Sequence, residues 1–302
     1  MSDTMEQAQF TDRSTCISCG SSRLSELSSG AFDEGEVGSF LRADPWGEDP
    51  MPFLAGRRWT YVQCGDCEQA FHRTILNPQW NERRFSKWMT REAIEAFEAS
   101  IKTPQKAFEK AARNTAHVLR LEALTREIRT GAVRLLDFGC GHGEFLAMCN
   151  LYGFDAVGVD RSSARRSNAL VPIFPELSDV SGPFHVVTMF EVLEHLDDPR
   201  GMLETLTTLI APGGVLVLET PDCSGVTGIH SLADYRKIHP LEHINGFTPD
   251  SMRRMAERLG YAAIGRPTTH VTIDPLRVVK SEVKRLVGGF MKPTTQQYFR
   301  KI

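Results

Sequence analysis

The chain has 302 residues, of which 24% are charged, and its net charge is −3 at pH 7. This length accommodates one domain of ordinary size and a small second one, and the weak negative charge provides no overall basic field for nucleic acid. No apolar run approaches the roughly 20 residues of a membrane-spanning helix, and the first residues lack signal-peptide features. We therefore expect a cytoplasmic, globular protein.

Two Cys-x-x-Cys pairs dominate the first part of the chain. Residues 1–14 are polar and are expected to form a disordered tail, followed by a small domain over residues 15–78. The paired cysteines of this domain are Cys16, Cys19, Cys64 and Cys67. Two such pairs suit tetrahedral coordination of a structural zinc ion by four thiolates. Metal-free reduced cysteines or a redox pair are the alternatives, but no thioredoxin-like strand and helix surround these pairs.

Residues 79–131 show mainly helical periodicity, interrupted at Pro104. Apolar residues recur at helical spacing in the second of these segments, which is typical of a helix that buries one face. We expect these helices to link the zinc-binding domain to the next domain and to lie on the substrate side.

The most informative segment is Val133–Gly143, which reads as a buried strand followed by a glycine loop. A helix follows, and then a second apolar strand, Ala156–Asp160, that ends on an acid. This order is typical of a nucleoside site at the carboxyl edge of a parallel sheet. The glycine spacing is not G-x-G-x-x-G, and Asp137 just before the loop would repel a pyrophosphate. The motif instead suits a ligand that carries an amino group and a sulfonium.

Two later blocks occur in the expected order, Phe184–Pro199 with the letters EVLEHL and Leu209–Pro221 with LIAPGGVL. Together with the glycine loop, they resemble the motifs of the class I S-adenosylmethionine (SAM) methyltransferases. This resemblance implies an α/β fold, a Rossmann-like, doubly wound and mostly parallel sheet, over residues 132–266. The continuous apolar strands separated by helices agree with that expectation.

The resemblance also implies which residues contact SAM. Seven positions match: Asp137, Gly139, Gly141, Asp160, Arg161, Phe190 and Glu191. The first three would hold the methionine moiety, Asp160 would bind the ribose hydroxyls, Arg161 would cover the adenine, and the last two would border the cofactor. Surface acids and a surface arginine at strand ends are the alternatives.

The catalytic side leaves three interpretations open. His243 or His195 can act as a general base, because imidazole titrates in the useful range. Glu242 and His243 match a Glu-His pair of the sugar C-methyltransferases that the chain resembles, although the tyrosine expected just before that pair is Pro240 here. Alternatively, Glu191, Glu194, His195 and His243 can hold a divalent metal ion, a constellation similar to that of small-RNA 2′-O-methyltransferases. The spacing from Glu191 to His195 would place these side chains on one helix face if the segment is helical. In the third interpretation they only stabilise the loop.

Residues 267–302 are basic and carry an apolar stripe, so we expect an amphipathic C-terminal tail. The stripe can cap the core or a second copy of the chain, which leaves monomer and homodimer open, or lie on an anionic membrane surface. We favour the first interpretation.

A zinc-binding domain before a methyltransferase core is similar to bacterial sugar C-methyltransferases and related small-molecule enzymes. The resemblance implies SAM-dependent transfer of a methyl group to a small-molecule acceptor, such as a sugar nucleotide or a specialised metabolite. The alternatives are an RNA methyltransferase with a zinc finger and a non-catalytic module that binds SAM and zinc. The sequence shows no basic stripe interleaved with aromatic residues, so nucleic acid is disfavoured as a partner.

Overall fold

The computed structural model describes residues 6–128, 131–167, 169–267, 275–276, 278–280, 283 and 295–302. The chain forms two compact units. Unit 1 consists of Met1–Thr103, Glu194–Arg200 and Pro221–Ser251, and unit 2 consists of Pro104–Leu193, Gly201–Thr220 and Met252–Ile302. Of the helices in the described ranges, none combines the length and the apolar content needed to cross a bilayer.

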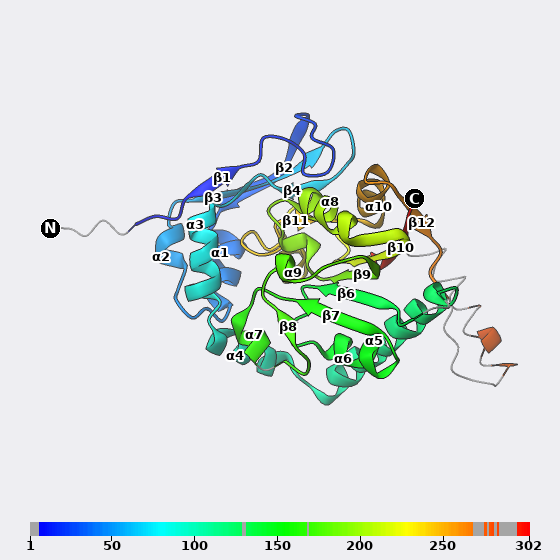
Figure 1. Cartoon of the computed structure of the whole chain (residues 1–302). Coiled ribbons are helices and arrows are strands. Elements are labelled where there is room, and N and C mark those ends of the chain that lie inside the picture. Colours follow the sequence, from blue (N-terminus) through cyan, green and yellow to red (C-terminus); the bar gives the residue numbers. More distant parts are fainter. Residues whose placement is uncertain are drawn as a thin grey trace. The chain divides into compact units, whose positions relative to one another are not determined.

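Unit 2 is built on a seven-stranded sheet with the order β12-β13-β10-β9-β6-β7-β8 (Figure 1). Its strands are β6 (Arg134–Phe138), β7 (Asp155–Val159), β8 (Ile173–Phe174), β9 (Phe184–Phe190), β10 (Ile210–Glu219), β12 (Tyr261–Ile264) and β13 (Gln297–Lys301). The β6–β7, β7–β8, β6–β9 and β9–β10 pairs are parallel, and β13 is antiparallel to both β10 and β12. The predicted α/β class with a mostly parallel sheet is therefore confirmed.

Helices alternate with these strands. They are α5 (Pro104–Thr125), α6 (Glu144–Leu151), α7 (Ser163–Ser167), η2 (Leu177–Asp179), α8 (Pro199–Leu209) and α10 (Pro249–Arg258). The sheet grows from β6 to β8 in one direction and then from β9 to β10 in the other. Because crossover connections are right-handed, this reversal puts the connecting helices on opposite faces of the sheet. The carboxyl ends of β6 and β9 are neighbours at the reversal, where α/β folds bind ligands.

The end of the chain differs from the prediction of a tail over residues 267–302. Its last residues form β13, in which Tyr298 is 2% exposed and Phe299 is fully buried. The strand is only five residues long and ends with two charged residues, Arg300 and Lys301, so its alternation gave no clear signal. Most of the expected tail, residues 268–274, 277, 281–282 and 284–294, lies outside the described residues.

Unit 1 contains two small sheets. β1 (Phe10–Asp12) pairs with β5 (Thr74–Leu76), and a four-stranded sheet has the order β11-β4-β3-β2. The strands of the larger sheet are β2 (Leu24–Ala31), β3 (Arg58–Cys64), β4 (Ala70–His72) and β11 (Asn245–Gly246). The helices are α1 (Gly35–Ala43), α2 (Met51–Leu54), α3 (Pro78–Arg83), η1 (Arg84–Trp88), α4 (Arg91–Ile101) and α9 (Leu232–Lys237), and a 3-10 turn, η3 (Leu193–His195), enters the unit from β9.

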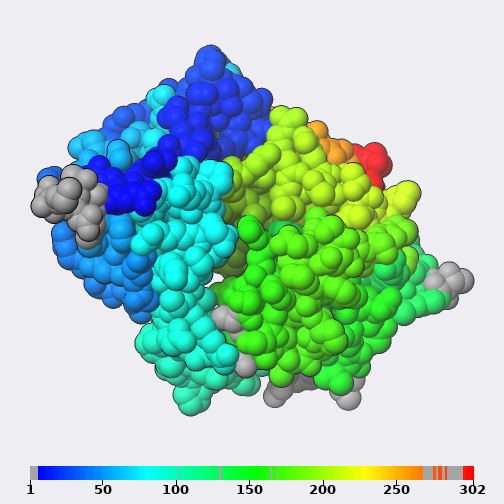
Figure 2. Space-filling model, turned by 60° about the vertical axis from the view of Figure 1, so that its left-hand side comes forward, coloured from blue at the N-terminus to red at the C-terminus, as the bar shows by residue number. Residues whose placement is uncertain are grey.

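The aromatic core of unit 1 joins segments that are distant in the sequence. Trp59, Trp80 and Trp88 are buried in one cluster with Tyr235, which belongs to the later part of the chain. In the space-filling view, residues 6–103 form one continuous body, coloured blue to cyan (Figure 2). The N-terminal residues expected to be disordered contribute to this unit, because Ala8 is fully buried and β1 begins at Phe10. Residues 1–5 lie outside the described part.

The boundaries of the two units differ from the predicted domains. Residues 194–200 and 221–251, expected within the SAM-binding domain, belong to unit 1. The two-residue strand β11 joins the edge of β4, with Asn245 opposite Phe71. A Cβ atom at Gly246 would lie 1.9 Å from the hydroxyl oxygen of Tyr61, so this close approach requires glycine. A strand of two residues has no periodicity, and for that reason the sequence did not reveal the exchange.

Candidate functional site

The glycine loop after β6 takes a conformation that side chains tolerate poorly. Gly139, Gly141 and Gly143 have φ angles of +78°, +59° and +74°, in the left-handed region that favours glycine. A Cβ atom at Gly139 would lie 2.2 Å from Cγ2 of Val192, which directly follows Glu191. The loop therefore packs closely against the residues after β9, at the carboxyl edge where the sequence predicted a nucleoside site.

Asp160 follows β7 and holds this loop in place. Its Oδ2 accepts a hydrogen bond of 2.8 Å from the backbone N–H of Gly141, and its Oδ1 accepts one of 2.8 Å from the N–H of Ser162. A carboxylate oxygen has two acceptor lone pairs, so both oxygens retain capacity for the two hydroxyls of a ribose. Arg161, the next residue, is exposed. The structure thus brings Asp160 and the glycine loop together.

Asp137 lies below the loop and is 3% exposed. Its Oδ1 accepts a hydrogen bond of 2.7 Å from the hydroxyl of Thr188 on the neighbouring strand β9. Burial raises the pKa of Asp137 to about 7, Thr188 opposes this effect, and the charge of Asp160 adds to it. The carboxyl group is therefore protonated in part at neutral pH, and a nearby positive charge would favour its ionised form.

Phe190 is the last residue of β9, and Glu191 follows it. The Phe190 ring lies 4.4 Å from the ring of His117, centroid to centroid. Glu191 has a φ of +55°, which is strained for a residue with a side chain, and its N–H donates a hydrogen bond of 2.8 Å to the carbonyl of Glu219. Desolvation, followed by repulsion from Glu219, raises the pKa of Glu191 to about 7, although the residue keeps solvent access, which screens the repulsion.

Sequence reasoning missed a polar network around Glu219, the last residue of β10. Its Oε2 accepts a hydrogen bond of 2.7 Å from Nε2 of Gln296 and lies 3.3 Å from Nε2 of His117. Arg120 donates to Oε1 of Gln296 over 2.7 Å. Burial alone would raise the pKa of Glu219, but the hydrogen bonds and charges around it lower the pKa. Glu219 ends β10 as Asp160 follows β7, and that parallel is the signal that could have identified it.

Unit 1 contains the residues predicted for the acceptor side. The ligand atoms of Glu194, His195 and His243 all lie within 4.8 Å of one another. Nε2 of His195 is 4.0 Å from Oε1 of Glu194, and the two imidazole rings are 4.6 Å apart, centroid to centroid. Glu191 is not a member of this group. The expected shared helix face is wrong, because Glu191 directly follows strand β9 while Glu194 and His195 lie on the 3-10 turn η3.

The orientation of both imidazoles is set by backbone groups. Nδ1 of His195 lies 2.9 Å from the carbonyl oxygen of Glu242, and because a carbonyl only accepts, Nδ1 carries the proton and Nε2 is directed at the other members. Backbone bonds to Arg236 and Lys237 also hold His243, whose buried Nδ1 has no hydrogen-bond partner among the described residues. Burial lowers the pKa of His243 to about 4, so this ring is neutral at pH 7. The donor set of one carboxylate and two imidazoles fits a divalent metal ion.

The four cysteines also form one cluster in unit 1. Sγ of Cys16 lies 3.4 Å from Sγ of Cys67, and Sγ of Cys19 lies 3.6 Å from Sγ of Cys64. These distances exceed the roughly 2.05 Å of a disulfide bond. Four sulfurs around a tetrahedral zinc ion, each at about 2.3 Å, are about 3.8 Å apart. The cluster therefore fits a zinc ion with little rearrangement.

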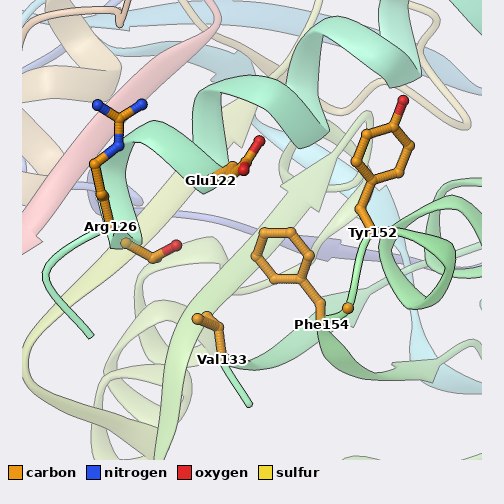
Figure 3. Close-up of a pocket in the computed structure, with 7 residues that line it drawn as sticks. Glu122, Arg126, Val133, Tyr152 and Phe154 are labelled. Atoms are coloured by element: carbon orange, nitrogen blue, oxygen red, sulfur yellow. The ribbon is translucent and has the colours of Figure 1, made fainter. Parts of the chain in front are cut away.

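A surface cavity of about 180 Å³ lies elsewhere in unit 2. Figure 3 shows Glu122 of α5 and Arg126, which follows that helix, on one side and Tyr152 and Phe154, after α6, on the other. Its lining includes Val133 and Phe154, which precede β6 and β7. The cavity thus lies at the amino-terminal edge of the sheet, opposite to the glycine loop, and is not part of the candidate site.

Comparisons with known proteins assign most of the chain to a family. The sequence profile of a methyltransferase domain family matches residues 80–264, more than half of the chain. A ubiquinone biosynthesis O-methyltransferase of a Caulobacter species is 34% identical over 123 residues, which cover 34% of this chain and 49% of that protein. The protein of that name from Marinobacter nauticus is 24% identical over 196 residues, covering 60% of this chain and 76% of that protein. The chain thus spans about half the length of the first of these relatives.

Among solved structures, the plantazolicin methyltransferase BamL, in complex with a triazolic desmethylPZN analog and SAH (S-adenosylhomocysteine), is similar in fold. The TM-score is 0.50 at 12% sequence identity, and the match covers 74% of this chain and 94% of that chain.

Proposed function

The chain belongs to the methyltransferase domain family, and on this basis we propose that it transfers a methyl group from SAM to a small-molecule acceptor. One observation carries the proposal: the carboxylate of Asp160 is hydrogen-bonded to the N–H of Gly141 in the glycine loop. An acid beside an open glycine loop, at the carboxyl edge of a parallel sheet, is the arrangement that receives the nucleoside part of a cofactor.

Each part of the cofactor then has a proposed partner in unit 2. Asp160 binds the ribose hydroxyls, and the exposed Arg161 covers the adenine. Gly139 and Gly141 let the backbone approach the methionine moiety, and the buried Asp137 acts on its positive charge. Phe190 and Glu191, at the end of β9, border the same moiety.

SAM, when bound, supplies a methyl group already activated by the sulfonium. The chain therefore has to orient the acceptor and hold its proton. For that task we propose Glu194, His195 and His243 of unit 1 as ligands of a divalent metal ion, which lowers the pKa of a coordinated hydroxyl. Glu242 fixes the orientation of His195 through its carbonyl oxygen, as outer partners of metal-binding histidines do. Separately, Cys16, Cys19, Cys64 and Cys67 are proposed to hold a structural zinc ion.

Calorimetric titration with SAH tests the proposed SAM-binding site. We expect one site in the wild type, and at least about tenfold weaker binding for Asp160→Ala, because two hydrogen bonds to the ribose are lost. Asp155→Ala is the matched control, since Asp155 begins β7, the strand that Asp160 follows, and is exposed. Equal binding by the wild type and Asp160→Ala would remove the assignment.

Metal analysis tests the proposed zinc site and the proposed divalent metal site. Native mass spectrometry of the purified protein should show one zinc ion, retained after mild chelation, and a second, weaker divalent ion on addition of Mn²⁺. His243→Ala should lose only the weaker ion, whereas His230→Ala, which changes an exposed histidine of the same unit, should keep both. Retention of the weaker ion by His243→Ala would leave His243 or His195 as a general base.

A further inference from the structure

Arg84 is a buried, positively charged residue that has no role in the proposed methyl transfer. It begins η1, a π-helical turn, and is 3% exposed. Within the described residues its guanidinium makes two hydrogen bonds, from Nε to Oδ1 of Asn81 at 3.0 Å and from Nη1 to the sulfur of Met89 at 3.7 Å. A guanidinium has five N–H donors, and a thioether is a weak acceptor. Much of its donor capacity is therefore available for a ligand or water.

Arg13 shows what a structural arginine looks like in the same unit. It is half-buried, and it donates twice to the carbonyl oxygen of His72, once to that of Ile244 and once to Oδ1 of Asn245, over 2.5 to 3.0 Å. These four bonds join β4 to the segment around β11. Buried polar groups in proteins are normally satisfied in this way. Arg84 departs from that pattern, and short π-helical turns often occur at functional sites.

The surroundings of Arg84 connect it with the acceptor residues. Burial lowers its pKa, and the negative charges of Glu242 and then Asp197 oppose this effect. Glu242 is the residue whose carbonyl oxygen orients His195. The guanidinium also lies over the ring of Phe85, 4.3 Å from its centroid, which leaves its N–H edge to make hydrogen bonds. A cationic fork thus lies near the carboxylate of Glu242, the residue that precedes the proposed metal ligand His243.

We propose that Arg84 binds an oxyanion, a carboxylate or a phosphate group, of the methyl acceptor. The planar guanidinium matches either group with paired hydrogen bonds, and the weak contact with Met89 can be exchanged for one of them. The inference rests on the proposed function and narrows it, because it makes the acceptor an anionic small molecule. Arg84 then sets specificity by anchoring the acceptor, while Glu194, His195 and His243 act on its reacting hydroxyl.

Anion titration of the full-length protein tests this site. Sodium benzoate and sodium phosphate are titrated by calorimetry into the wild type, Arg84→Met, Arg84→Lys and the control Arg73→Met, in which an exposed arginine of the same unit changes. We expect saturable binding of one anion to the wild type and the control, and at least about tenfold weaker binding to Arg84→Met. Arg84→Lys should be intermediate, because it keeps the charge and loses the fork. A preference for benzoate or phosphate identifies the kind of oxyanion.

Two results would overturn the inference: no saturable binding of either anion to the wild type, or equal binding by Arg84→Met. If Arg84→Met does not fold, by circular dichroism, Arg84→Lys decides, and unchanged binding in that variant overturns the inference as well. SAH titration of the same samples keeps the two proposals separate. If the wild type does not bind SAH, the methyltransferase proposal is contradicted. If Arg84 contacts only the acceptor, all variants should bind SAH like the wild type.

Discussion

Gly139 is a residue of the candidate site at which a side chain would clash. Gly139→Ala adds a Cβ atom that would lie 2.2 Å from Cγ2 of Val192 at a φ of +78°. We expect a loss of roughly 1–3 kcal/mol of unfolding free energy from strain and overpacking, and at least about tenfold weaker SAH binding. Denaturant unfolding and calorimetry measure the two effects.

Gly153→Ala is the matched control for Gly139→Ala. Gly153 has a φ of +86°, but the space around its Cβ position is open, so this variant shows the backbone cost alone, about 1 kcal/mol. If Gly139→Ala costs no more than Gly153→Ala and binds SAH like the wild type, the packing of the loop against Val192 is irrelevant to the site.

The raised pKa of Asp137 predicts that cofactor binding depends on pH. Its pKa of about 7 in the folded protein lies above the ordinary value of 3.8. The folded state therefore favours the neutral form, and its stability falls as the pH rises from about 4 to about 7. The ammonium group of SAH favours the ionised form, so SAH binding should tighten as the pH rises through about 7.

Two variants show which carboxyl group causes the pH dependence of SAH binding. In Asp137→Asn the affinity should change little with pH, whereas in Glu191→Gln the pH dependence caused by Asp137 should remain. The second variant is needed because the pKa of Glu191 is also raised to about 7. Calorimetric titrations between about pH 6 and about pH 8 provide the measurement. A wild-type affinity that does not change with pH, or that weakens as the pH rises, contradicts the prediction.

Among the strands, β13 supports the sheet from the far end of the chain. It lies between β10 and β12, and Phe299 is fully buried. Phe299→Ala should lower the unfolding free energy by about 3–5 kcal/mol, as large-to-small changes in cores do. Ile302→Ala, at a side chain that is 89% exposed, should change it by less than about 0.5 kcal/mol. A similar shift of the urea midpoint in both variants would mean that β13 is only loosely attached.

Strand length and proximity in sequence explain which elements could be predicted. β6, β7, β9 and β10 are apolar and pair with one another through short connections, so periodicity and motif order identified them within a few residues. β11 has two residues and β13 has five, and each pairs with strands far away in the sequence. Local patterns carry no information about such partners. The region between the two cysteine pairs forms β2, α1 and α2, short elements that its glycines and prolines hid from the sequence pattern.

The residues of the candidate site were predictable where one local segment of the sequence contains them. The glycine loop and Asp160 were predictable together, since one strand-loop-helix-strand segment contains both. The four cysteines were predictable from their spacing. The network of His117, Glu219 and Gln296 was not predictable, because it forms only when α5, β10 and the residue before β13 come together. Arg84 gave no signal in the sequence, because its importance lies in the hydrogen bonds that it lacks.

The composition of unit 1 from three separate segments predicts how the molecule responds to loss of zinc. The cysteine cluster holds the ends of the β2–β3 pair, where Leu24 lies opposite Cys64, and β4 continues this sheet to β11, two residues after His243. Structural zinc contributes on the order of 10 kcal/mol to small domains. Cys67→Ser should therefore loosen residues 58–72 and 243–246 together and weaken binding of the divalent ion at His243. SAH binding, which depends on unit 2, should remain.

Hydrogen exchange measured by mass spectrometry, combined with SAH calorimetry, checks this prediction. Cys223→Ser is the control, because Cys223 is a buried cysteine of the same unit outside the cluster, and it should leave exchange at residues 58–72 near the wild-type level. Faster exchange of residues 134–160 in Cys67→Ser, with loss of SAH binding, would show that unit 2 does not hold its fold independently. Faster exchange confined to unit 1 would mean that the zinc cluster controls the acceptor residues through β4 and β11 and leaves the cofactor residues unaffected.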